Sequence, residues 1–145
     1  MVRSVITAFI LLLASTALAG AADFEVDMVN KAADGTMMAF DPPLTRVAVG
    51  DTVTFVAKDK GHDAQSIPGM LPDGATAING PMSQDVKVTF TVPGVYGIRC
   101  LPHFGLGMVA LVVVGDHPAN LDAAKSVQLP SLARTRLEPL WAQFQ

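Results

Sequence analysis

Apolar and polar residues alternate over short stretches of the chain between residues 23 and 114, with turn residues between the stretches. FEVDMVN (24–30), TVTFVA (52–57) and VKVTFTVPGVYGIRC (86–100) show the alternation that is typical of strands with one buried face. MVALVVVGD (108–116) is apolar almost throughout, as expected of a strand in the core. About six to eight short strands without intervening helices predict an all-β fold, an antiparallel β-sandwich or barrel.

The segment GHDAQSIPGMLPDGATAINGPMSQD (61–85) interrupts this pattern, because it is rich in Gly and Pro and has little periodicity. It is predicted to be a long surface connection that holds at most one short strand or turn. Long loops inside compact domains are often functional, so this segment is a candidate to contribute residues to a site.

Beyond the last predicted strand the pattern becomes helical, over residues 118–128 and 130–144. Asn120 and Ser131 are candidate N-caps, and Pro139 is expected to bend or shorten the second helix. We expect an apolar stripe to pack the second helix on the sandwich. Its members are Leu132, Leu137, Leu140, Trp141 and Phe144.

The N-terminus has the layout of a secretory signal peptide. Arg3 precedes an apolar run (5–14), and the small residues of STALAGAAD follow, which predicts cleavage after Ala19 or Ala21. The apolar run is too short for a membrane anchor and no stop-transfer charges follow it. Residues 1–21 are therefore interpreted as a signal peptide, and the periplasm is the expected location.

The remainder is expected to form a β-sandwich over residues 22–116 and a helical extension over residues 117–145. The formal net charge is −3, and removal of Arg3 with the signal peptide changes it to about −4. A mildly acidic chain without a basic run argues against binding to nucleic acid or to anionic membranes. A soluble, exported, monomeric domain is the expected class.

The only cysteine, Cys100, lies in CLPHFGLGM (100–108) together with His103 and Met108. A lone cysteine in an exported chain cannot form an internal disulfide, so the thiol is inert, pairs with another chain, or binds a ligand. Cys and Met are soft sulfur ligands and imidazole is borderline. Two imidazoles, one thiolate and a distant thioether together suit copper in electron transfer.

The second imidazole must come from His62 or His117. His62 directly follows the predicted strand 52–57, and loops after adjacent strands share one end of a sandwich, so His62 is the preferred ligand. His117 is expected to be a solvated residue at the start of a helix. Copper is favoured over zinc, since structural zinc sites normally close with Cys or His rather than a thioether. It is also favoured over an inert thiol.

Several segments in order resemble the cupredoxins, and most of all the pseudoazurins: DFEVDMVNKAADG, FDPPLTRVAVGDTVTFVAKDKGHD, IPGMLPDGA, VTFTVPGVYGIRCLPHFGLGMV and VGDHPANLDAAK. The resemblance implies a Greek-key β-sandwich with two C-terminal helices and one type 1 copper. It implies that His62, Cys100 and His103 are ligands and that Met108 is a weak axial ligand. It also implies a non-enzymatic carrier of single electrons in the periplasm, often to copper nitrite reductase during denitrification.

Two features depart from the pattern of the pseudoazurins. The family normally has Asn after the first ligand histidine, where this chain has Asp63. A carboxylate cannot donate as an amide does, and its negative charge near copper favours Cu(II), so Asp63 is expected to lower the reduction potential. The family's ring of lysines is also sparse. Lys31, Lys60 and Arg99 match members of the ring, and Lys58 lies close by.

The resemblance implies an apolar docking patch around His103 for redox partners such as copper nitrite reductase or c-type cytochromes. We expect Met37, Met38, Pro102, Phe104 and Leu106 to form it. Core packing of one of the two adjacent methionines is the alternative, because neighbouring strand residues face opposite ways. The alternatives are a copper-delivery protein, or a carrier whose acceptor is a cytochrome or a peroxidase.

Overall fold

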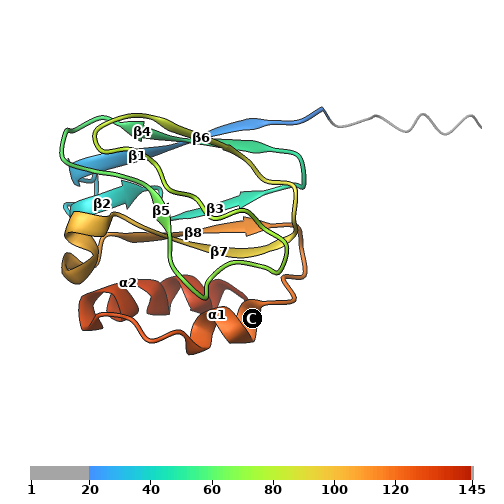
Figure 1. The fold of residues 1–145 in the computed structure, drawn as a ribbon. Helices are drawn as coiled ribbons and strands as arrows, with labels where there is room; N and C mark the ends of the chain where they lie inside the picture. Colours follow the sequence, from blue (N-terminus) through green and yellow to red (C-terminus); the bar gives the residue numbers. More distant parts are fainter. Residues whose placement is uncertain (1–19, 145) are drawn as a thin grey trace, which may run out of the picture.

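The structure is a computed structural model, and it describes residues 20–144. Two β-sheets and a layer of helices are stacked on one another, with the helices against the second sheet only (Figure 1). The predicted signal peptide, residues 1–21, lies almost entirely outside the described residues. The predicted β-sandwich with C-terminal helices is confirmed.

Each sheet has four strands. The first sheet contains, in spatial order, β2 (Met37–Asp41), β1 (Asp23–Lys31), β4 (Thr52–Ala57) and β6 (Val86–Thr89). The second sheet contains β3 (Leu44–Val47), β8 (Val109–Val114), β7 (Gly94–Arg99) and β5 (Gln65–Ser66). Strands that are neighbours in the chain therefore often lie in different sheets, as in a Greek key.

Two strand pairs are parallel, which corrects the expectation of a wholly antiparallel sandwich. β1 pairs with β4 in parallel, and β3 pairs with β8 in parallel. The reason lies in the connections, because the chain crosses from the first sheet to the second between β2 and β3 and returns in β4. Such a crossover brings a strand back in the same direction as its neighbour, whereas a hairpin reverses it.

Two hydrophobic clusters explain the strand patterns. The main cluster lies between the sheets, where the rings of Phe40 and Phe55, and of Phe90 and Tyr96, meet edge to face. The second cluster lies between the outer face of the second sheet and the helices. All six residues of β8 are buried, because one face contacts each cluster. The apolar run in this strand is thereby explained.

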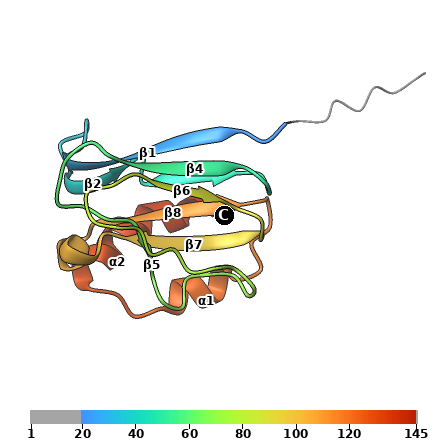
Figure 2. The same cartoon turned by 45° about the horizontal axis from the view of Figure 1, so that its top comes forward.

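The helices α1 (Leu121–Ser126) and α2 (Ser131–Trp141) cover the outer face of the second sheet, and a 3-10 turn, η2 (Ala142–Phe144), ends the described chain (Figure 2). Leu137 and Leu140 are buried as predicted, but Leu132 is exposed, which corrects the stripe. Within residues 20–144, no helix is long and apolar enough to cross a membrane.

The helix starts differ from the prediction. Ser131 is the first residue of α2, preceded by Pro130 at the cap position, so Ser131 is not the cap. Asn120 does occupy the cap position of α1, but its side chain bonds the backbone of Val95 instead of the helix. Pro139 lies inside α2, which continues for two more residues. Packing on the sheet therefore decides these ends more than local capping does.

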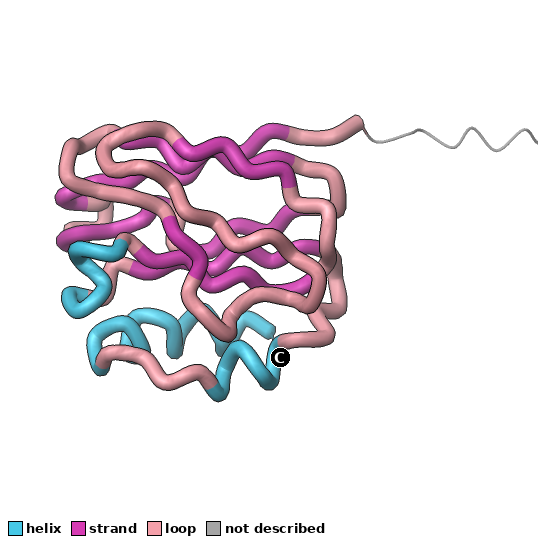
Figure 3. Tube along the Cα trace, in the orientation of Figure 1, coloured by secondary structure: helices cyan, strands magenta, loops and turns pink. Residues whose placement is uncertain are grey.

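The segment 61–85 runs mostly as loop from the first sheet to the second and back (Figure 3). It holds one short strand, β5, as predicted, and that strand pairs with the edge of β7. It is not wholly a surface connection, however, because Ile67 and Met70 are buried in the second cluster. Its first residues lie at the same end of the sandwich as the cysteine loop.

Candidate metal centre

The segment between β7 and β8 forms a 3-10 turn, η1 (Leu101–Leu106), at one end of the sandwich (Figure 1). Pro102 suits the first turn, because proline has no N–H to lose and its φ is already set. Gly107 ends the turn with φ of 83°, a left-handed conformation that favours glycine, and its N–H donates to the Phe104 oxygen. The turn therefore holds a fixed shape between two anchored strands.

Two backbone hydrogen bonds close this loop around the predicted ligands. The Cys100 N–H donates to the Met108 oxygen at 3.1 Å, and the Met108 N–H donates to the His103 oxygen at 3.1 Å. Cys100 and Met108 are fully buried, and His103 is half-buried. The three sequence-predicted residues of this loop thus lie together in the structure.

His62 comes from the loop after β4, on the other sheet, and its side chain is fully buried. Ser83 holds this loop in place, because its N–H donates to the His62 oxygen at 2.7 Å and its hydroxyl accepts from the Gly61 N–H at 2.9 Å. The prediction that His62 faces the cysteine loop is confirmed.

The donor atoms of His62, Cys100 and His103 converge on one point. The two Nδ1 atoms are 3.1 Å apart, and Cys100 Sγ is 3.4 Å from His103 Nδ1 and 3.7 Å from His62 Nδ1. A metal bonded at about 2.0–2.3 Å to nitrogen and sulfur places its ligand atoms about 3–4 Å from one another. These separations fit one small metal ion at the centre of the three atoms.

The surroundings of His62 favour a neutral ring with Nδ1 free for the metal. Its Nε2–H donates to the Asn30 amide oxygen at 3.0 Å, which fixes the proton on Nε2. Burial, followed by the charge of the nearby His103 ring, lowers the pKa of His62 below its usual value. Asn30 was not predicted as part of the site, because three further strands separate it from His62 in the chain and no motif marks it.

The thiol of Cys100, unlike the Nδ1 atom of His62, carries a proton in the metal-free protein. Burial raises the pKa of Cys100 above its usual value, so the thiol keeps its proton when no metal is bound. A metal ion displaces that proton, because a coordinating thiol is deprotonated by the charge of the ion. The buried thiol is thus inert toward solvent and available to a soft metal.

Asp63 joins the two ligand loops from a buried position. Its Oδ1 accepts from the Leu101 N–H at 2.7 Å, and its Oδ2 accepts from the side-chain amide of Gln65 at 2.9 Å. The tie between the loops therefore needs only acceptor atoms on this residue, and the carboxylate supplies them. Gln65 was not predicted, and only the pairing of β5 with β7 places it there.

His117 lies apart from the site. It is exposed, it follows the far end of β8, and it is not among the residues that converge with Cys100. The expectation that His117 is a solvated residue near a helix start is confirmed.

The surface around His103 is apolar. Leu101, Leu106 and Met37 are 50%, 51% and 52% exposed, and Pro102 is exposed beside them. The adjacent Met38 is partly buried against the main cluster, so of the two methionines only Met37 belongs to the exposed surface.

Two side chains, Phe104 and Lys58, differ from expectation. Phe104 is half-buried against the second cluster, with the Arg99 guanidinium 5.3 Å above its ring, so it is less exposed than predicted. Lys58 forms ion pairs with Glu25 and Asp27 at 3.4 and 3.6 Å, which neutralise much of its charge. The positive rim is therefore sparser than the sequence alone indicates.

Comparison with known proteins identifies the family. Residues 26–115 match the model of the copper binding proteins of the plastocyanin/azurin family. The chain is 49% identical over 133 residues to pseudoazurin of Methylorubrum extorquens, covering 92% of this chain and 89% of that protein. It is 45% identical to pseudoazurin of Paracoccus pantotrophus, covering 91% and 90% of the two chains. The chain belongs to the plastocyanin/azurin family of copper-binding proteins.

Solved structures of pseudoazurins also match this chain. The crystal structure of pseudoazurin from Methylobacterium extorquens AM1 matches with a TM-score of 0.82 and 50% identity, over 85% of this chain and 99% of that chain. Pseudoazurin from Hyphomicrobium denitrificans matches with a TM-score of 0.79 and 40% identity, over 83% and 97%. The predicted resemblance to pseudoazurins is confirmed. Family and donor set together identify the metal as one type 1 copper.

Proposed function

We propose that this protein is a periplasmic carrier of single electrons, with copper held by His62, Cys100 and His103 and by Met108 as a weak axial ligand. The bound copper supplies the redox chemistry, because it alternates between Cu(II) and Cu(I). Three of the four residues lie in one loop whose ends are anchored in β7 and β8. Ligands held in this way move little between oxidation states, which favours fast electron transfer.

The exposure of His103 is the observation that carries this proposal. His62, Cys100 and Met108 are fully buried, whereas His103 is half-buried under an apolar surface. One ligand therefore offers a short route for electrons between the metal and a partner. Four protein ligands also leave no open position for a substrate, which favours a carrier over an enzyme.

The apolar patch, defined here as Met37, Leu101, Pro102 and Leu106, is the proposed contact with redox partners. Apolar surface without a dense ring of charges suits brief contacts that are steered only weakly at long range. Copper nitrite reductase in denitrification is the proposed acceptor, since the pseudoazurin resemblance implies it. A c-type cytochrome or a peroxidase is the alternative acceptor.

The copper assignment is tested by colour. The copper-loaded, oxidised protein is expected to be blue or green from charge transfer between Cys100 and copper, and to bleach reversibly on reduction. Cys100→Ser is expected to abolish the colour, and His117→Ala is expected to retain it. A colourless wild-type protein with one bound copper per chain would contradict the type 1 assignment.

The partner assignment is tested by stopped-flow electron transfer to purified copper nitrite reductase and to a c-type cytochrome. Leu106→Ser is expected to slow the preferred reaction about tenfold, equivalent to ~1.4 kcal/mol of lost contact. Val49→Ser is the matched control, because Val49 is equally exposed but lies in the turn before β4, at the other end of the sandwich. Equal effects of the two variants would overturn the patch, and transfer of copper itself would indicate a delivery protein.

A further inference from the structure

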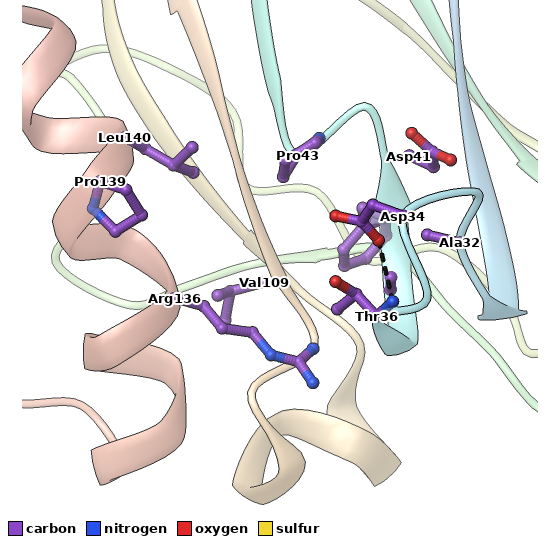
Figure 4. A pocket seen from close by; sticks show the side chains of 11 residues that line it. Ala32, Asp34, Thr36, Asp41, Pro43, Val109, Arg136, Pro139 and Leu140 are labelled. Carbon is purple, nitrogen blue, oxygen red and sulfur yellow. Dashed lines mark hydrogen bonds between the residues drawn. The ribbon is translucent and has the colours of Figure 1, made fainter.

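Arg136 connects helix α2 to two backbone segments at the metal end of the sandwich. Its Nη1 donates to the Met38 oxygen at 2.8 Å and to the Gly107 oxygen at 3.0 Å, and its Nη2 donates to the Met37 oxygen at 2.8 Å. Figure 4 shows the side chain extending from the helix toward the turn that contains Thr36. One side chain therefore joins the C-terminal helix, the start of β2 and the end of the ligand loop.

Gly107 shows how closely the helix approaches that loop. A Cβ atom at this position would lie 3.0 Å from Cδ and Nε of Arg136 and 3.0 Å from the Leu132 oxygen. Such contacts are tighter than side chains normally allow, so the helix rests directly on the loop backbone. Gly107 immediately precedes Met108, so any shift of this contact moves the proposed axial ligand.

The other end of the bridge is also a special conformation. Met38 has φ of 49°, in the left-handed region that a residue with a side chain seldom adopts. Arg136 stabilises this conformation, because its guanidinium donates to the backbone oxygens of both Met38 and Met37. The β2 start and the ligand loop are therefore fixed relative to each other by the same guanidinium.

The guanidinium of Arg136 donates to backbone oxygens rather than to a carboxylate. Within residues 20–144, the salt bridges involve other side chains, and the nearby Asp34 accepts from the Thr36 N–H at 2.8 Å instead (Figure 4). Arginine is suited to this task, because its rigid planar fork presents several donors at fixed angles. A lysine has the same charge but presents its donors from a single nitrogen.

We propose that Arg136 is a positioning residue for the copper, which acts by holding Gly107, and through it Met108, at a fixed place relative to Cys100 and His103. The inference rests on the proposed ligand set. It predicts that the axial interaction depends on the fork of Arg136 more than on its charge.

The first test uses the copper-loaded protein. Arg136→Lys keeps the charge, Arg136→Gln removes it, and Arg134→Gln is the control for charge on an exposed site of the same helix. Both Arg136 variants are expected to change the intensity ratio of the two charge-transfer bands, which reports the axial interaction, and the control is expected to leave it unchanged. A ratio unchanged in both Arg136 variants, or changed equally in the control, would overturn the inference.

The second test uses metal-free protein and does not depend on copper. Hydrogen exchange is measured at the amides of Cys100 and Met108, whose bonds close the ligand loop. Arg136→Lys is expected to speed their exchange about tenfold, as for the loss of one charge-assisted hydrogen bond, while amides of β1 are unchanged. Unchanged exchange at both amides overturns the inference, whatever metal the site binds.

A last variant separates this inference from the proposed function. Met108→Leu is expected to change the same band ratio in the copper-loaded protein. If it does not, Met108 is not the axial ligand and the proposed ligand set fails, and with it the copper-dependent part of the inference. The exchange measurement then still decides whether Arg136 holds the loop.

Discussion

The two ends of strand β4 each carry a buried aspartate, and the same amino acid has a different task at each end. Asp51, just before the strand, accepts the Ala22 N–H at 2.7 Å and the Ala48 N–H at 2.8 Å. Asp63, beyond the other end, accepts one backbone N–H and one side-chain amide beside the metal ligands. Two histidines differ in a similar way: His62, next to Asp63, is buried, whereas His117, beyond the end of β8, is exposed.

We therefore expect Asp51 to contribute mainly to the stability of the fold and Asp63 mainly to the reduction potential of the copper. Both oxygens of Asp51 bond backbone donors that cannot turn away, so that end depends on having two acceptors. One oxygen of Asp63 bonds Gln65, whose amide can rotate to present its oxygen, so that end tolerates an amide but feels the change of charge. The residue type alone does not reveal which role applies, because the partners decide it.

The largest expected effect comes from Asp51→Asn. The new amide group must face a backbone N–H, so one hydrogen bond is lost and two donors oppose each other. Unfolding of the metal-free protein in urea is expected to show a loss of ~2–4 kcal/mol. The reduction potential of the copper-loaded protein should stay unchanged. A stability like that of the wild type would show that the far end does not need both acceptors.

The second effect is the pH dependence that distinguishes the two histidines. The pKa of His62 is lowered by burial in the folded state, so below about pH 6.5 the unfolded chain binds a proton that the folded chain does not. The metal-free protein should therefore lose stability as the pH falls below that value, by at most ~1.4 kcal/mol per pH unit. His62→Gln should remove this slope, and His117→Gln should leave it; the reverse result would contradict the assignment.

Asp63→Asn is expected to act mainly on the metal. Removing a negative charge beside copper favours Cu(I), so the potential should rise on the order of 50 mV, where ~59 mV is tenfold in a one-electron equilibrium. Stability should change by less than ~1 kcal/mol, since the Leu101 N–H keeps an acceptor and Gln65 can rotate. Redox titration checks the first expectation, and a potential that falls or stays constant would refute it.

The smallest effect is expected from Lys58→Ala, which is the control for the change of charge in Asp63→Asn. Lys58 directly follows β4, but its side chain forms exposed ion pairs with Glu25 and Asp27 of β1, and Lys58→Ala removes them. Exposed pairs contribute little, so the loss of stability should be below ~0.5 kcal/mol and the potential should be unchanged. A shift of potential as large as that of Asp63→Asn would show that the Asp63 effect is not local.

Most of the site was predictable from short-range patterns. Cys100, His103 and Met108 lie in one loop between two strands, and the spacing of the residue types indicates copper without any tertiary information. His62 needed only one further rule, that loops after adjacent strands meet at one end of a sandwich. The burial of β8 was also predictable, because the residues on both faces of this strand are apolar.

The partners of these ligands were not predictable in the same way. Asn30 and Arg136 contact the site through hydrogen bonds that span 32 and 29 residues of chain. Gln65 is only two residues from Asp63, but the pairing of β5 with β7 places it there. Each of the three is a common polar residue without a motif. The same limit explains the errors at the surface. Phe104 and Leu132 both lie beside glycines or polar residues, and only the packing of α2 decides which is covered.

The sequence by itself therefore determined the fold class, the donor set and the metal, because these depend on periodicity and on the chemistry of residues close together in the chain. The tertiary structure alone decided the parallel pairing of β1 with β4 and the different roles of Asp51 and Asp63. It also decided the bridge from Arg136 to the ligand loop. Hydrogen bonds between distant segments form only once the sheets are packed, so local sequence patterns do not predict them.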